Sequence, residues 1–83
     1  MTREDYQQVK HGIAIRLQQM RKKRGLTQAK LGELSGTNQA VIQKIENGKS
    51  RSPRVIEDLA FALDVNPAWL QWGEPFALMQ VDS

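Results

Sequence analysis

Residues 25–48 read GLTQAKLGELSGTNQAVIQKIENG, and this stretch decides the fold of the chain. Glycines at both ends and near the middle divide it into two short segments. Each segment opens with a residue that caps helices, Thr27 in the first and Asn38 in the second. Ile42 and Ile45 share one side of the second segment. Two short helices joined by a glycine-containing turn are therefore predicted.

The polar face of the second helix carries amides and amines rather than the Glu/Lys pairs of a solvated helix. Its members are Asn38, Gln39, Gln43, Lys44, Asn47 and Lys49. In the major groove of DNA, Gln and Asn pair with adenine, and Lys or Arg pairs with guanine. Gln39, Gln43 and Lys44 fit that chemistry, and the methyl group of Ala40 fits a thymine methyl. We therefore expect this helix to read base edges of double-stranded DNA, with Gln28 of the preceding helix facing a phosphate.

A longer helix precedes this pair. Ile13, Leu17 and Met20 recur at helical spacing up to the basic run RKKR at 21–24, which a glycine ends. The same apolar stripe continues upstream into residues 1–12, an N-terminal extension that is a candidate start for this first helix. The run at 21–24 is either the solvated end of the helix or, in part, a phosphate contact.

Two further helices follow the pair. Their apolar positions are Ile56, Leu59, Ala60 and Leu63 in the first, and Trp69 and Leu70 in the second. Pro53 leads into the first of them, and Asn66 with Pro67 forms a cap and first-turn pair for the second. Residues 74–83 have no helical period, and we expect a C-terminal tail that is one candidate for dimer contacts.

Five short helices without a strand pattern predict an all-α domain over residues 13–73, with helices two and three as a helix-turn-helix. The helix expected from Gln28 to Ser35 should be buried through Ala29 and Leu31. The chain has 83 residues, enough for one small domain, and no Cys. His11 stands without a cluster of other metal ligands, so no metal, cofactor or catalytic role is expected.

Charge is distributed unevenly along the chain. Residues 12–63 carry ten Lys/Arg against four Asp/Glu, whereas the charged residues of 64–83 are three acidic ones. A basic middle indicates a face that meets a polyanion. The N-terminal stretch lacks the apolar region of a signal peptide, and no apolar run is long enough to cross a membrane, so a cytoplasmic location is expected.

The sequence from 25 to 74 resembles the Cro/C1-type (XRE-like) helix-turn-helix family, which includes the repressors and Cro proteins of lambdoid phages. The resemblance covers roughly residues 13–73 and rests on several pieces in order and at the right spacing. These pieces are Leu26-Thr27-Gln28, Gly36, Ile45-Glu46-Asn47-Gly48, Arg54 after Pro53, and Pro67-Ala68-Trp69-Leu70. The family implies a compact, lambda-repressor-like domain in a phage or prophage Cro-like repressor, bound as a dimer to a pseudo-palindromic operator.

The resemblance also assigns roles to matching positions. Base edges would be met by Gln39, Ala40 and Lys44, with Asn38 and Gln43 close by. The DNA backbone would be contacted by Gln28, Asn47, Lys49, Ser50, Arg51 and Arg54. Arg21 and Glu46 would form a partly buried pair that ties the first helix to the third. Dimer contacts are expected at Val55, Val65, Pro67, Trp69, Trp72 and Phe76, of which Trp72 and Phe76 are equally candidates for covering the core.

Two positions depart from the family pattern. Gly32 stands where the family usually has Ala; it keeps the close approach of the helices but costs about 1 kcal/mol of helix propensity. Ser35 stands where an apolar residue is more common, so looser packing of the helix from Gln28 to Ser35 is expected. Other interpretations also remain open. One alternative is an antitoxin-like autorepressor that also binds a protein partner through its tail. A second is the N-terminal domain of a longer repressor, and a third is a helical protein-interaction module without specific DNA binding.

Overall fold

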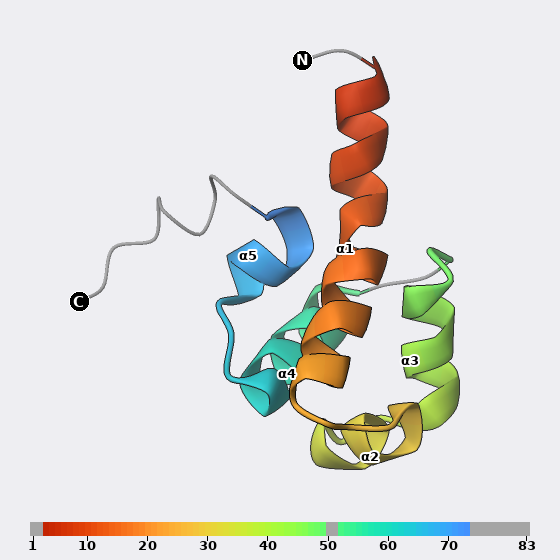
Figure 1. Cartoon of the computed structure of the whole chain (residues 1–83), viewed down its shortest axis with the longest axis vertical. Coiled ribbons are helices and arrows are strands. Elements are labelled where there is room, and N and C mark those ends of the chain that lie inside the picture. Colours follow the sequence, from red (N-terminus) through yellow and green to blue (C-terminus); the bar gives the residue numbers. More distant parts are fainter. Residues whose placement is uncertain (1–2, 50–51, 74–83) are drawn as a thin grey trace, which may run out of the picture.

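The computed structural model describes the main chain of residues 3–49 and 52–73, with side chains from Gly12 onward. Within these ranges it contains five α-helices and no strand (Figure 1). The helices are α1 (Arg3–Lys23), α2 (Gln28–Leu34), α3 (Gln39–Glu46), α4 (Pro53–Leu63) and α5 (Pro67–Trp72). The all-α prediction is confirmed. Ser50, Arg51 and the tail from residue 74, with Phe76, lie outside the described residues.

Each helix after α1 begins next to a side chain that caps it. Oxygen atoms of Thr27, Asn38, Ser52 and Asn66 accept hydrogen bonds from main-chain N–H groups in the first turns of α2 to α5. Proline occupies the first position of both α4 and α5, where its missing N–H costs nothing. The helix starts are thus fixed by local chemistry, and the turns between them are correspondingly short.

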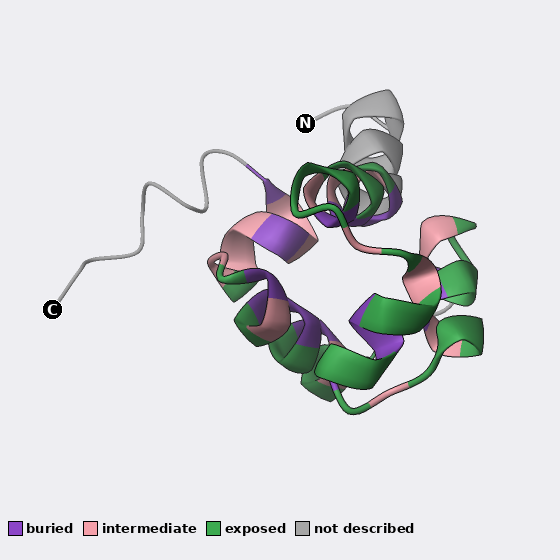
Figure 2. Ribbon diagram, turned by 60° about the horizontal axis from the view of Figure 1, so that its bottom comes forward, coloured by how far each residue is buried: buried purple, intermediate pink, exposed green. Residues whose placement is uncertain are grey.

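The core lies where the five helices converge. Its buried side chains are Ile13, Leu17, Leu31, Ile42, Ile45, Ile56, Leu59, Ala60, Leu63 and Leu70. α2 packs on α3, α1 packs on α3 and α5, and α4 packs on α5. The buried stripes all turn inward, and the exposed faces of α2, α3 and α4 turn outward (Figure 2). No helix within the described ranges has the length and apolar character that a bilayer crossing requires.

The prediction that Ala29 is buried is wrong. Its side chain is exposed, whereas Leu31, Gly32 and Ser35 are buried. These three positions recur at helical spacing and form the inner face of α2, and Ala29 falls outside that face. A seven-residue helix has room for one such face only.

α2 and the start of α3 meet at the level of the main chain. A Cβ atom added to Gly32 would lie 2.5 Å from the carbonyl carbon of Asn38 and 2.8 Å from its Cα. Ser35, where looser packing was expected, is buried, and its hydroxyl donates to the carbonyl oxygen of Gly32 at 3.2 Å. The same hydroxyl lies 2.8 Å from the hydroxyl oxygen of Thr37. Gly32 and Ser35, the two departures from the family pattern, therefore both contribute to the close contact between α2 and the turn before α3.

Replacing Gly32 by Val should destabilise the domain by about 3 kcal/mol, because the added atoms would overlap the Asn38 main chain. Ala29→Val, on the exposed side of the same helix, should change stability by no more than about 0.5 kcal/mol. Urea unfolding followed by circular dichroism measures both. Equal effects of the two substitutions would show that α2 and α3 do not meet this closely.

Candidate nucleic-acid interface

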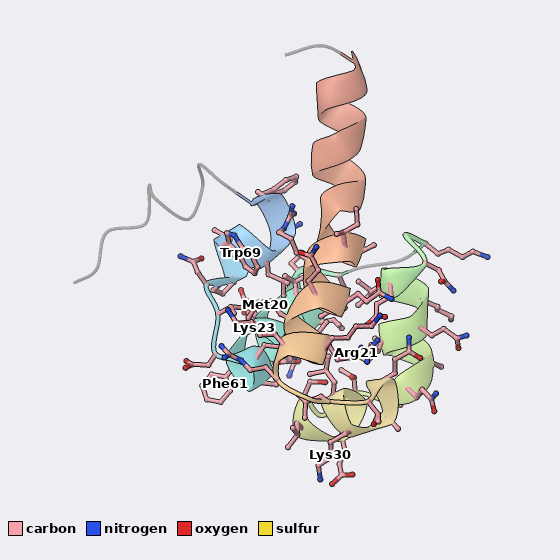
Figure 3. The ribbon with its side chains drawn as sticks, in the orientation of Figure 1. Met20, Arg21, Lys23, Lys30, Phe61 and Trp69 are labelled. Carbon is pink, nitrogen blue, oxygen red and sulfur yellow. The ribbon has the colours of Figure 1, made fainter. Side chains whose placement is uncertain are left out.

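The outer face of α3 is polar and open to solvent. Its exposed residues, with the N-cap residue, are Asn38, Gln39, Ala40, Gln43 and Lys44. The opposite face places Ile42 and Ile45 in the core, and Val41 is half-buried between the two faces. Side chains of α3 extend away from the domain along its outer edge (Figure 3). All five predicted base-reading positions therefore share one accessible surface.

Candidate phosphate-binding residues follow α3 and begin α4. Asn47 ends α3 as its C-cap and is exposed, and Lys49 is exposed two residues later. The main-chain N–H of Lys49 donates to the carbonyl oxygen of Lys44 at 2.9 Å, which folds this segment back against the end of α3. Arg54 is exposed in the first turn of α4. Asn47 and Lys49 border the α3 face at its C-terminal end, and Arg54 follows at the start of α4, whereas Ser50 and Arg51 lie outside the described residues.

A buried ion pair holds α3 against α1. Arg21 Nε lies 2.7 Å from Glu46 Oε2, and Arg21 Nη2 lies 3.1 Å from Glu46 Oε1, so the two side chains meet at two points. Arg21 Nη1 also donates to the carbonyl oxygen of Leu26 at 2.8 Å. The hydrogen bonds that Arg21 donates to Glu46 raise the pKa of the Arg21 guanidinium above its ordinary value. The geometry matches the predicted pair.

Gln28, expected to face a phosphate, is half-buried beside this pair. Its Nε2 donates to Glu46 Oε1 at 3.1 Å. The carboxylate of Glu46 thus receives hydrogen bonds from α1 and from the first residue of α2. Sequence reasoning missed this contact, because residues 18 positions apart carry no local signal of their meeting. The phosphate contact of Gln28 stays a prediction.

The basic run at 21–24 divides into structural and exposed residues. Arg21 is buried, and Arg24 Nε donates to the carbonyl oxygen of Leu63 at the end of α4, at 3.0 Å. Lys22 and Lys23 are exposed. Lys23 lies on the side of α1 away from α3 (Figure 3). The run is therefore no continuous phosphate-binding strip next to α3.

Five of the six predicted dimer residues are described, and they lie on α4, on α5 and in the turn between these helices, whereas Phe76 lies outside the described residues. Val55, Val65, Trp69 and Trp72 are half-buried, and Pro67 is exposed. Val55, Val65 and Trp69 pack against the core, so only part of each side chain is open to a partner. Arg16 fixes the last turn of α5 on α1, donating to the carbonyl oxygens of Leu70 at 2.9 Å and Gln71 at 2.7 Å.

Arg21→Met should destabilise the domain by about 3 kcal/mol, because it leaves the Glu46 carboxylate buried without its cation. The double variant Arg21→Met with Glu46→Leu should recover a large part of that loss, because it leaves no unpaired charge. Lys22→Met, one residue away and exposed, is the matched control and should change stability by about 0.5 kcal/mol at most. Urea unfolding of the four proteins checks this; a double variant less stable than Arg21→Met would contradict it.

Comparison with known proteins agrees with this geometry. Residues 17–70 match the helix-turn-helix family, a segment that runs from α1 to α5. The HTH-type transcriptional regulator PrtR of Pseudomonas aeruginosa is 44% identical to this chain over 62 residues, which is 75% of this chain and 24% of that protein. The chain thus corresponds to about a quarter of this relative. With the two central helices, the polar α3 face and the Arg21–Glu46 pair in place, the chain belongs to the Cro/C1-type (XRE-like) helix-turn-helix family of DNA-binding transcriptional regulators.

Proposed function

We propose that this protein is a sequence-specific transcriptional repressor of the Cro-like type that binds a pseudo-palindromic operator in double-stranded DNA as a dimer. The observation that carries the proposal is the outer face of α3. Gln39, Gln43 and Lys44 are exposed together on a helix whose other face is held in the core by two isoleucines. A solvated helix face has no need of this combination of amides and an amine.

The chemistry of this face fits the major groove of DNA. An α-helix enters that groove, where Gln recognises adenine through two hydrogen bonds and Lys donates to guanine. Gln39 lies at the first turn of α3, the part of a recognition helix that reaches deepest, and Lys44 lies more than one turn later. Ala40, exposed between them, supplies a methyl group for thymine. Asn38 and Gln43 extend the same surface and are the secondary candidates for base contacts.

The DNA backbone would be held at one end of α3 and from the start of α4. Asn47, Lys49 and Arg54 are exposed there, and Ser50 and Arg51 lie between them in the sequence. Gln28 would join them by turning its amide from Glu46 to a phosphate. Such contacts fix the register of the protein on DNA, and the base contacts then provide the sequence preference.

A dimer would place two α3 helices about 34 Å apart, one helical turn of DNA, so that each reads one half-site. We propose that the contacts between the two copies come from the half-buried residues at the ends of α4 and on α5. The candidates are Val55, Val65, Pro67, Trp69 and Trp72, together with Phe76, which lies outside the described residues. The partial exposure of Val55, Val65, Trp69 and Trp72 supports the proposal, because each still has apolar area to bury.

Selection of bound duplexes from a random DNA pool at physiological salt should yield a motif with two-fold symmetry. Gln39→Ala and Lys44→Ala should each weaken the preference at defined positions of both half-sites, by about 1–3 kcal/mol for each lost contact. Lys23→Ala removes a charge from the side of α1 away from α3 and should leave the motif unchanged. A motif that survives both α3 substitutions would exclude α3 as the reader of bases.

Lys49→Ala and Arg54→Ala should weaken binding about equally on all DNA sequences. Each should reduce the slope of log affinity against log salt concentration by about 1, because one fewer counterion is released. Titration of a labelled operator at several salt concentrations measures the slope, with Lys23→Ala again as the control. A changed base preference in either variant, with an unchanged slope, would contradict a phosphate contact.

A further inference from the structure

Arg16 of α1 holds the C-terminal end of α5. Its Nε donates to the carbonyl oxygen of Leu70 at 2.9 Å, and its Nη2 donates to that of Gln71 at 2.7 Å. Carbonyl groups in the last turn of a helix have no partner within the helix, and a cation beside them is favourable. One guanidinium therefore satisfies two of these groups and ties the end of α5 to α1.

The guanidinium lies between two glycines, Gly12 of α1 and Gly73 after α5. A Cβ atom would lie 2.5 Å from Arg16 Nη1 if it were added to Gly12, and 3.0 Å if it were added to Gly73. Gly73 is buried and has a φ of 77°, a conformation that favours glycine. Both glycines thus leave space for the guanidinium and confine it on two sides.

The orientation of α5 depends on this contact. α5 has six residues, too few for a helix that is stable alone, and Leu70 is its buried residue. Its first turn is capped by Asn66, whereas its last turn is held on α1 by Arg16. Trp69 and Trp72, two of the proposed dimer residues, belong to the same short helix and are half-buried. The direction in which they face a second copy therefore follows from where Arg16 holds the end of α5.

The same helix, α1, also holds α3. Arg21 follows Arg16 by five residues, which corresponds to a rotation of about 140° around the helix axis. Its guanidinium binds the carboxylate of Glu46 at the end of α3. Figure 1 shows α3 and α5 on opposite sides of α1. α1 is therefore the common support of the face proposed to read bases and of the helix proposed to join two copies.

We propose that Arg16 is a positioning residue that determines the spacing of the two half-sites in the operator. By fixing α5 on α1, it sets the distance between the two α3 helices of the dimer; the inference therefore rests on the proposed dimer. One base pair more between the half-sites moves one of them by about 3.4 Å and turns it by about 35° around the DNA axis. A dimer with α5 held in one orientation matches one spacing, whereas a dimer whose α5 can shift tolerates several.

The test uses duplexes that carry two copies of the selected half-site in two-fold arrangement, with spacers that differ by one base pair. The wild type should bind one spacing about a hundredfold more tightly than its neighbours, because both copies bind at once only there. Arg16→Met should reduce this ratio to about tenfold or less, because α5 is no longer held in one orientation. Its base preference on a single half-site should stay that of the wild type. Unfolding alone would instead weaken binding to the single half-site and to every spacing by the same factor.

Two further variants serve as control and second test. Lys23→Met removes one positive charge from an exposed position of the same helix and should keep the wild-type ratio. Gly12→Ala keeps Arg16 and improves the helix propensity of α1, but its Cβ would displace Arg16 Nη1, so the ratio should fall. 

The outcomes separate this inference from the proposed dimer. An unchanged ratio in Arg16→Met, or an equal fall in Lys23→Met, would overturn the role of Arg16 while leaving the dimer in place. If Arg16→Met does not fold, the ratio measured for Gly12→Ala decides in the same way. Wild-type affinities that do not depend on spacing would overturn the proposed dimer, and this inference with it.

Discussion

One carboxylate, that of Glu46, organises the helix-turn-helix. It receives both contacts from Arg21 of α1 and one from Gln28 of α2, and it belongs to the last residue of α3. Arg21 also donates to the carbonyl oxygen of Leu26 in the loop between α1 and α2. Glu46 therefore links the first three helices, and its partner Arg21 adds the loop that joins α1 to α2.

This linkage matters because α3 depends on the rest of the domain for its stability and its orientation. A helix of eight residues is unstable in isolation. A recognition helix must also leave one face polar, so α3 contributes only Ile42 and Ile45 to the buried core. Val41, half-buried, packs against the core beside them. The ion pair at the C-terminal end of α3 adds a directional contact, which contributes to orientation more than to net stability, since desolvation offsets much of the attraction of a buried pair.

The elements governed by local chemistry could be predicted from the sequence. Caps at Thr27, Asn38 and Asn66 act on the residues next to them, and the period of buried residues on α4 follows from helix geometry alone. Ala29 was misplaced because a helix of seven residues contains too few apolar positions to define its inner face. The family resemblance, rather than any local pattern, supplied the pairing of Arg21 with Glu46.

Contacts between segments far apart in the sequence could not be predicted from a local pattern. Arg16 and Arg24 hold the ends of α5 and α4 through main-chain carbonyl oxygens 39 to 55 residues away. Gly12, an unfavourable residue inside a helix, lies against the guanidinium of Arg16. A Cβ at Gly12 would lie 2.5 Å from Arg16 Nη1, so the glycine leaves room for the guanidinium that fixes α5. The sequence alone shows that this glycine lowers helix propensity, but not that it lies next to the Arg16 guanidinium.

Because these arginines form hydrogen bonds within the domain, the basic composition overstates the positive charge that faces a polyanion. Of the ten Lys/Arg in residues 12–63, Arg16, Arg21 and Arg24 donate to groups within the domain. Among the described residues, the exposed cations assigned to DNA are Lys44 on α3, Lys49 after it and Arg54 at the start of α4. Phosphate attraction that rests on so few charges is modest, and it is the part of the affinity that all DNA sequences share. Because these three arginines are bonded within the domain, the proposed DNA binding would rely more on base contacts from the α3 face, which favours discrimination over general affinity.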